Sequence, residues 1–95
     1  MAIEIDKDKL TWLYRTMRLI RRFEEKYLEL LNSGVPFGTG HLYIGHEAVA
    51  TGVSAHLRDS DYIGSNHRGH GHCLAKGVDP IAMMEAARAM RVEDI

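Results

Sequence analysis

Two glycine- and histidine-rich stretches stand out in this chain: GHLYIGHEA at residues 40–48 and SNHRGHGH at residues 65–72. Glycines let backbone amides approach a ligand closely. The arginine among them, Arg68, carries the planar fork of donors best suited to a bidentate grip on phosphate. Histidines beside it titrate near neutral pH and can donate hydrogen bonds or carry protons. This composition favours one wall of an anion-binding active site over an ordinary loop.

Composition narrows the class of protein. A chain of 95 residues forms one small domain or a piece of a larger one. The net charge of -1 gives no reason to expect a nucleic-acid partner. The sequence has no apolar run of about 18 residues and no charged-then-apolar leader, so we expect neither a membrane span nor a signal peptide. Its one cysteine, Cys73, cannot form an internal disulfide, which fits a reducing, cytoplasmic location.

The first third of the chain has a helical pattern from about residue 6 to residue 33. Asp6 or Asp8 can cap its start, and Gly34 with Pro36 beyond it supplies the stop. Apolar side chains recur at three- and four-residue steps and form one stripe. The stripe consists of Leu10, Leu13, Tyr14, Met17, Ile20, Phe23, Tyr27, Leu28 and Leu31.

The rest of the chain predicts shorter elements. After a glycine-rich loop over residues 34–45, a second helix is expected over about residues 45–57, with Glu47 in its positive first turn. That helix is apolar nearly all round, which predicts burial among neighbours. Residues 62–64 form a short strand at best, and Asp79 followed by Pro80 starts a last helix. We therefore expect a mostly α-helical chain with at most one or two short strands.

The clustered side chains of His67, His70, His72 and Cys73 also suggest zinc, because imidazole and thiolate are its usual ligands. The spacing argues against this, since all four lie within a few residues, no distant second pair exists, and Arg68 places a fixed positive charge among them. We therefore expect no metal site here. A metal-binding protein and a small helical interaction module without catalysis remain the alternatives to an enzyme.

Three ordered motifs resemble a known family: RRFEE at residues 21–25, HLYIGHEAVA at residues 41–50 and HRGHGH at residues 67–72. Together they resemble the N-terminal part of the alpha subunit of thiamine-diphosphate-dependent 2-oxo acid dehydrogenases, of the acetoin and bacterial pyruvate dehydrogenase type. The resemblance implies an α/β parent with a parallel sheet flanked by helices, of which residues 1–95 form an N-terminal fragment. It also implies cleavage or decarboxylation of acetoin or pyruvate and acyl transfer to a lipoyl carrier.

The resemblance also implies roles for individual residues. Arg68 matches the arginine that contacts the cofactor diphosphate, and His41 matches a catalytic histidine near the thiazolium and the substrate. His67 stands beside the arginine, where pyruvate-type members carry a tyrosine, and is expected to border the cofactor. His70 matches a histidine near the cofactor channel and is expected to be catalytic. His46 departs from the usual glutamine before the glutamate, which leaves acetoin and pyruvate both open.

The family binds its cofactor through magnesium, held by a Gly-Asp-Gly motif that these 95 residues do not contain. Its members work with a beta subunit, which supplies the glutamate that activates the cofactor, and with a lipoyl acyltransferase. The resemblance therefore implies these two partners, magnesium in the full-length subunit, and an oligomer. We expect the 95 residues alone to be inactive and to bind thiamine diphosphate negligibly.

Overall fold

The computed structural model describes residues 5–34, 42–65 and 68–89. These residues form four helices: α1 (Lys7–Asn32), α2 (Glu47–Ser54), α3 (His70–Ala75) and α4 (Pro80–Ala89). The mostly helical expectation is confirmed. No strand occurs in the described ranges, which agrees with the expectation of at most one or two short strands, and residues 62–64 do not form one. A strand forms by pairing with a neighbour, and this segment is unpaired, with Tyr62 fully exposed. The parallel sheet implied for the whole domain stays a prediction.

The long helix α1 follows its local signals closely. The Asp6 side chain accepts a hydrogen bond of 2.8 Å from the Lys9 amide and caps the first turn. At the other end Ser33 is the C-cap, and Gly34 follows with φ of +94°. Glycine adopts this left-handed conformation without a steric penalty, so the helix ends here. The expected bounds of 6–33 therefore agree with the structure to within one residue.

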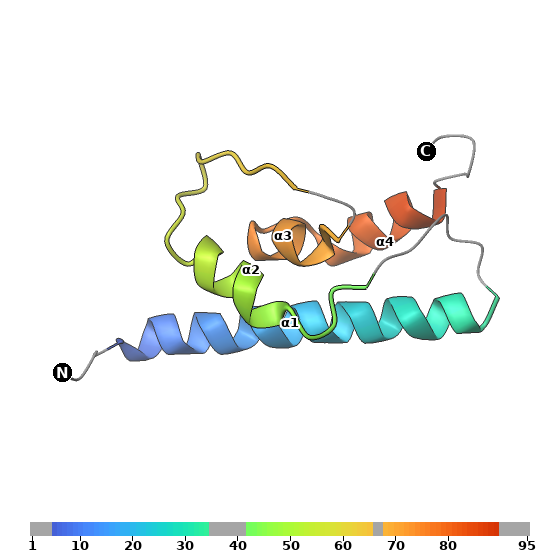
Figure 1. The fold of residues 1–95 in the computed structure, drawn as a ribbon, viewed down its shortest axis with the longest axis horizontal. Coiled ribbons are helices and arrows are strands. Elements are labelled where there is room, and N and C mark those ends of the chain that lie inside the picture. Colours follow the sequence, from blue (N-terminus) through green and yellow to red (C-terminus); the bar gives the residue numbers. More distant parts are fainter. Residues whose placement is uncertain (1–4, 35–41, 66–67, 90–95) are drawn as a thin grey trace.

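Helices α2, α3 and α4 all lie on one side of α1 (Figure 1). Helices α1, α2 and α3 contact one another pairwise. Their contact region holds the buried core, with Met83 and Met84 of α4 packed against it. The core consists of Ile20, Phe23, Tyr43, Ala50, Leu74 and Ala75. The apolar stripe of α1 is only partly covered, because Leu10 and Tyr14 are exposed.

Helix α2 is shorter and less buried than the sequence predicts. It begins at Glu47 because Gly45, with φ of +96°, lies outside the helical region, and it ends at Ser54. Only one face is covered, and Val49 and Val53 are 59% and 60% exposed. The expectation that α2 is surrounded by neighbours is therefore wrong for the described chain.

The two later helices differ in how well the sequence predicts them. For α4, the Asp79 carboxylate accepts a hydrogen bond of 3.2 Å from the Ala82 amide, so the expected cap ahead of Pro80 is confirmed. Helix α3 is not among the elements that the sequence predicts, although it includes part of the second glycine- and histidine-rich stretch. Among the described residues, no helix has the length and apolar character needed to span a bilayer.

Candidate functional site

The two glycine- and histidine-rich stretches meet in the structure. The Arg68 guanidinium donates a hydrogen bond of 3.1 Å from Nη1 to the backbone carbonyl of Leu42. This contact joins positions 26 residues apart in sequence. The Arg68 side chain is exposed. His41 and His67 lie outside the described residues, and their expected roles stay predictions.

Tyr43 fastens the segment before α2 to helix α3. Its ring is 5% exposed and lies directly over Gly71, where a Cβ atom would overlap the ring carbons. It also meets the His72 ring edge-on, with centroids 5.3 Å apart, and the His46 ring at 5.5 Å. Burial raises the pKa of the Tyr43 hydroxyl; a backbone hydrogen bond at Ala50 opposes this rise, and the charge of Glu47 adds to it. Gly71 is thus required by a close approach of a side chain to the backbone of α3.

His70, the first residue of α3, faces helix α1. Its Nδ1 atom lies 2.7 Å from Oε1 of Glu24, a residue with no exposed surface. The imidazole lies 5.4 Å from the Phe23 ring, edge-on, and 5.1 Å from the Tyr27 ring. Its side chain keeps 24% of its surface exposed. The expected catalytic histidine is therefore held by a buried acid and two aromatic rings rather than displayed on a loop.

Glu24 is an unusual buried group. Burying a carboxylate costs several kcal/mol unless partners compensate. Its Oε1 atom pairs with His70, whereas its buried Oε2 atom accepts no hydrogen bond from a described residue. Burial raises the pKa of the neighbouring Tyr27 hydroxyl, and the charge of Glu24 raises it further. The partner that the described structure gives this carboxylate is the imidazole of His70.

A second acid, Glu47, ties the start of α2 to α1. Its Oε2 accepts a hydrogen bond of 2.8 Å from the Gly45 amide, and its Oε1 accepts one of 3.3 Å from Arg21. Burial alone would raise the pKa of Glu47, but hydrogen bonds from its own amide, Arg21 and Gly45 outweigh burial and hold this pKa below its ordinary value. Glu47 is thus an ionised structural acid that orients the segment carrying Tyr43.

The other two described side chains that were considered as zinc ligands, those of His72 and Cys73, have separate surroundings. His72 pairs through Nδ1 with Ser65 Oγ at 2.7 Å, and Cys73 is half-buried. Within residues 5–34, 42–65 and 68–89, no three histidine, cysteine or acidic side chains are close enough to hold a metal ion. His67 lies outside these ranges.

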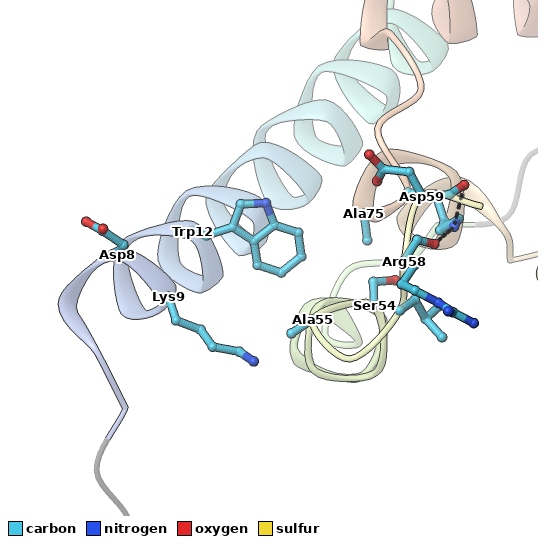
Figure 2. Close-up of a pocket in the computed structure, with 10 residues that line it drawn as sticks. Asp8, Lys9, Trp12, Ser54, Ala55, Arg58, Asp59 and Ala75 are labelled. Atoms are coloured by element: carbon cyan, nitrogen blue, oxygen red, sulfur yellow. Dashed lines mark hydrogen bonds between the residues drawn. The ribbon is translucent and has the colours of Figure 1, made fainter. Parts of the chain in front are cut away.

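A cleft of about 450 Å³ lies elsewhere, between the first turns of α1 and the end of α2 (Figure 2). Lys9 and Trp12 line one side, and Arg58 lies across from them. Lys76 fixes that far side by donating hydrogen bonds of 2.9 and 2.8 Å to the carbonyls of Arg58 and Asp61. Neither Arg68 nor His70 lines this cleft.

The structure adds Glu24, Tyr43 and Arg21 to the residues that the sequence predicted for the site. A signal for Glu24 was present, because it lies four residues after Ile20 and three before Tyr27, on the buried face of α1. A glutamate at such a position is informative, since buried acids are rare without a partner. Tyr43 and Arg21 gave no comparable signal, because their contacts lie in other parts of the chain.

Comparison with known proteins supports the family resemblance that the three sequence motifs indicated. The model of the family described as "Dehydrogenase E1 component" matches residues 15–93. The alpha subunit of acetoin:2,6-dichlorophenolindophenol oxidoreductase from Cupriavidus necator is 52% identical over 85 residues, covering 88% of this chain and 25% of that protein. The subunit of the same name from Bacillus subtilis is 54% identical over 83 residues, covering 87% and 25%.

A relative named for a different activity is also similar. The pyruvate dehydrogenase E1 component subunit alpha of Zymomonas mobilis is 46% identical over 80 residues, covering 83% of this chain and 23% of that protein. No solved structure gives a significant match. The chain spans about a quarter of the length of the curated relatives it matches. The family match covers most of the chain, and on that ground the chain belongs to the dehydrogenase E1 component family.

Proposed function

We propose that this chain is part of the alpha subunit of a thiamine-diphosphate-dependent dehydrogenase that acts on acetoin or pyruvate. The observation that carries the proposal is the identity of 52% and 54% to two acetoin oxidoreductase alpha subunits over most of the chain. The identity of 46% to a pyruvate dehydrogenase subunit is the reason that pyruvate is proposed beside acetoin. In this proposal, Arg68 and His67 contact the cofactor, His41 contacts both cofactor and substrate, and His41 and His70 are the catalytic histidines.

The charges of the described residues fit the diphosphate end of such a cofactor. Two acidic side chains near the contact between the two glycine- and histidine-rich stretches already have basic partners. Glu47 pairs with Arg21, and Glu24 pairs with His70. Arg68 is exposed at the contact between these two stretches, and its guanidinium donates a hydrogen bond to the Leu42 carbonyl. A guanidinium carries several N–H donors in a planar fork whose geometry matches phosphate oxygens. The exposed cation supports the proposal that Arg68 recognises the anionic end of the cofactor.

In this proposal, the residues of this chain bind the cofactor and orient the reacting groups. Thiamine diphosphate, when bound, supplies the electron sink for breaking a carbon–carbon bond beside a carbonyl. Arg68 binds the diphosphate, and His70 holds or moves a proton at its ring nitrogen opposite Glu24. Magnesium would complete the neutralisation of the phosphates, through residues of the subunit other than these 95. A beta subunit and a lipoyl acyltransferase are the proposed partners, the latter receiving the acyl group, in an oligomeric, cytoplasmic assembly.

The test is a comparison of substrates. The alpha subunit that contains this chain is purified with its beta subunit, and reduction of 2,6-dichlorophenolindophenol is followed with acetoin or with pyruvate. We expect reduction that requires thiamine diphosphate and is faster by at least roughly tenfold with one of the two substrates. No cofactor-dependent reduction with either substrate, by a complex that remains assembled, would contradict the proposal.

A further inference from the structure

The pairing of His70 with Glu24 links two helices through one short polar contact. The 2.7 Å separation between Nδ1 and Oε1 is typical of a charge-assisted hydrogen bond. The glutamate is fully buried, and the imidazole keeps 24% of its side-chain surface exposed. The contact therefore joins a fully buried carboxylate to a partly exposed imidazole.

The geometry points to a specific protonation state. An ionised carboxylate only accepts hydrogen bonds, so an imidazole paired with one carries its proton on the facing nitrogen, which here is Nδ1. A neutral imidazole has one ring proton, and Nε2 is then left as an acceptor. The Phe23 and Tyr27 rings both pack against the imidazole and restrict its rotation, which disfavours an exchange of its two nitrogens.

A purely structural role explains the buried acid poorly. Oε2 of Glu24 is buried and accepts no hydrogen bond from a described residue, so the carboxylate is only half satisfied. A glutamine would place the same volume there at a lower desolvation cost. An amide can accept through its oxygen or donate through its nitrogen, whereas an ionised carboxylate only accepts, and this restriction dictates where the imidazole proton lies.

We infer that Glu24 is a positioning residue that fixes His70 as the Nδ1–H tautomer and presents Nε2 as the proton-accepting atom. The inference rests on the proposed function only in giving His70 a catalytic task. Similar pairs of a carboxylate and a histidine orient the imidazole in hydrolases and in metal sites. Neither a metal ion nor a second acid is required for the effect.

Nitrogen NMR of the 95-residue chain tests the inference without substrate or cofactor. At about pH 8.5, where ordinary imidazoles are neutral, long-range proton–nitrogen couplings report the tautomer of each ring, and a His70→Asn variant identifies the His70 signals. We expect the Nδ1–H form of His70 to dominate by roughly tenfold or more, as one charged hydrogen bond supplies. An Nε2–H form, or a doubly protonated ring, in the wild-type chain would overturn the inference.

Two glutamate variants separate positioning from packing. Glu24→Gln should shift His70 toward the Nε2–H form by roughly tenfold. Glu25→Gln should leave His70 unchanged, because the Glu25 side chain is 45% exposed and pairs with Arg22 instead. An unchanged tautomer in a folded Glu24→Gln chain would overturn the inference. If that variant does not fold, the wild-type measurement decides alone.

The complete enzyme gives an independent readout. There, Glu24→Gln should lower kcat and leave the affinity for thiamine diphosphate unchanged, since the carboxylate acts through His70 and not on the diphosphate. A loss of cofactor affinity with kcat unchanged would overturn the positioning role. If the NMR results are as expected but no acetoin or pyruvate activity exists, the proposed function fails and the tautomer assignment stands.

Discussion

Replacing Gly71 with alanine tests the contact that holds the candidate site together. The added Cβ atom would overlap the ring of Tyr43, which is nearly buried and cannot move into solvent without losing its contacts with His72 and His46. Overpacking of this kind costs about 1–3 kcal/mol. The alanine also gains about 0.5–1 kcal/mol of helix propensity over glycine. The net expectation is a free energy of unfolding lowered by up to about 2.5 kcal/mol.

Gly52→Ala is the matched control for this change. Gly52 also lies inside a helix, α2, but a Cβ atom there would meet no heavy atom within 4 Å. That variant should gain the propensity without the overlap, so the two variants should differ by about 1–3 kcal/mol in urea unfolding followed by far-UV circular dichroism. If Gly71→Ala stabilises the chain as much as Gly52→Ala does, the close packing of Tyr43 on α3 is wrong.

Two further predictions concern acid stability and association. Because the pKa of Glu47 is lowered in the folded chain, its stabilisation is present above its ordinary value of 4.5 and is lost as the pH falls through the lower folded value. Glu47→Gln should therefore cost about 1 kcal/mol at neutral pH and less at about pH 3; an equal cost at both pH values would refute this. Exposed Leu10, Tyr14, Val49 and Val53 predict self-association of the 95-residue chain. A monomer at all concentrations in sedimentation would contradict that prediction.

The sequence predicts those elements whose causes are local. The bounds of α1 follow from Asp6 at one end and Gly34 at the other, and the start of α4 follows from Asp79. These signals act within a few residues, so one sequence suffices to find them. The helical class of the fragment could be predicted for the same reason.

The features that were missed depend on contacts between distant residues. Helix α3 has no apolar period and contains Gly71, and its contacts include Tyr43 over Gly71 and Glu24 at His70. Glu24 and His70 are 46 residues apart, so their pairing leaves no local pattern. The meeting of Arg68 with Leu42 is non-local in the same way, although the motifs already indicated that both stretches belong to one site.

The central claim is that Arg68 binds the diphosphate of thiamine diphosphate. Calorimetry of cofactor binding, with magnesium, to the alpha subunit containing this chain and its beta subunit tests the claim directly. Because Arg68 is exposed, we expect Arg68→Ala to cost about 1.5 kcal/mol, at the lower end for a charged hydrogen bond, which weakens binding roughly tenfold. Arg68→Lys should recover only part of the loss, since it lacks the planar fork. Unchanged affinity in a folded Arg68→Ala complex would contradict the account.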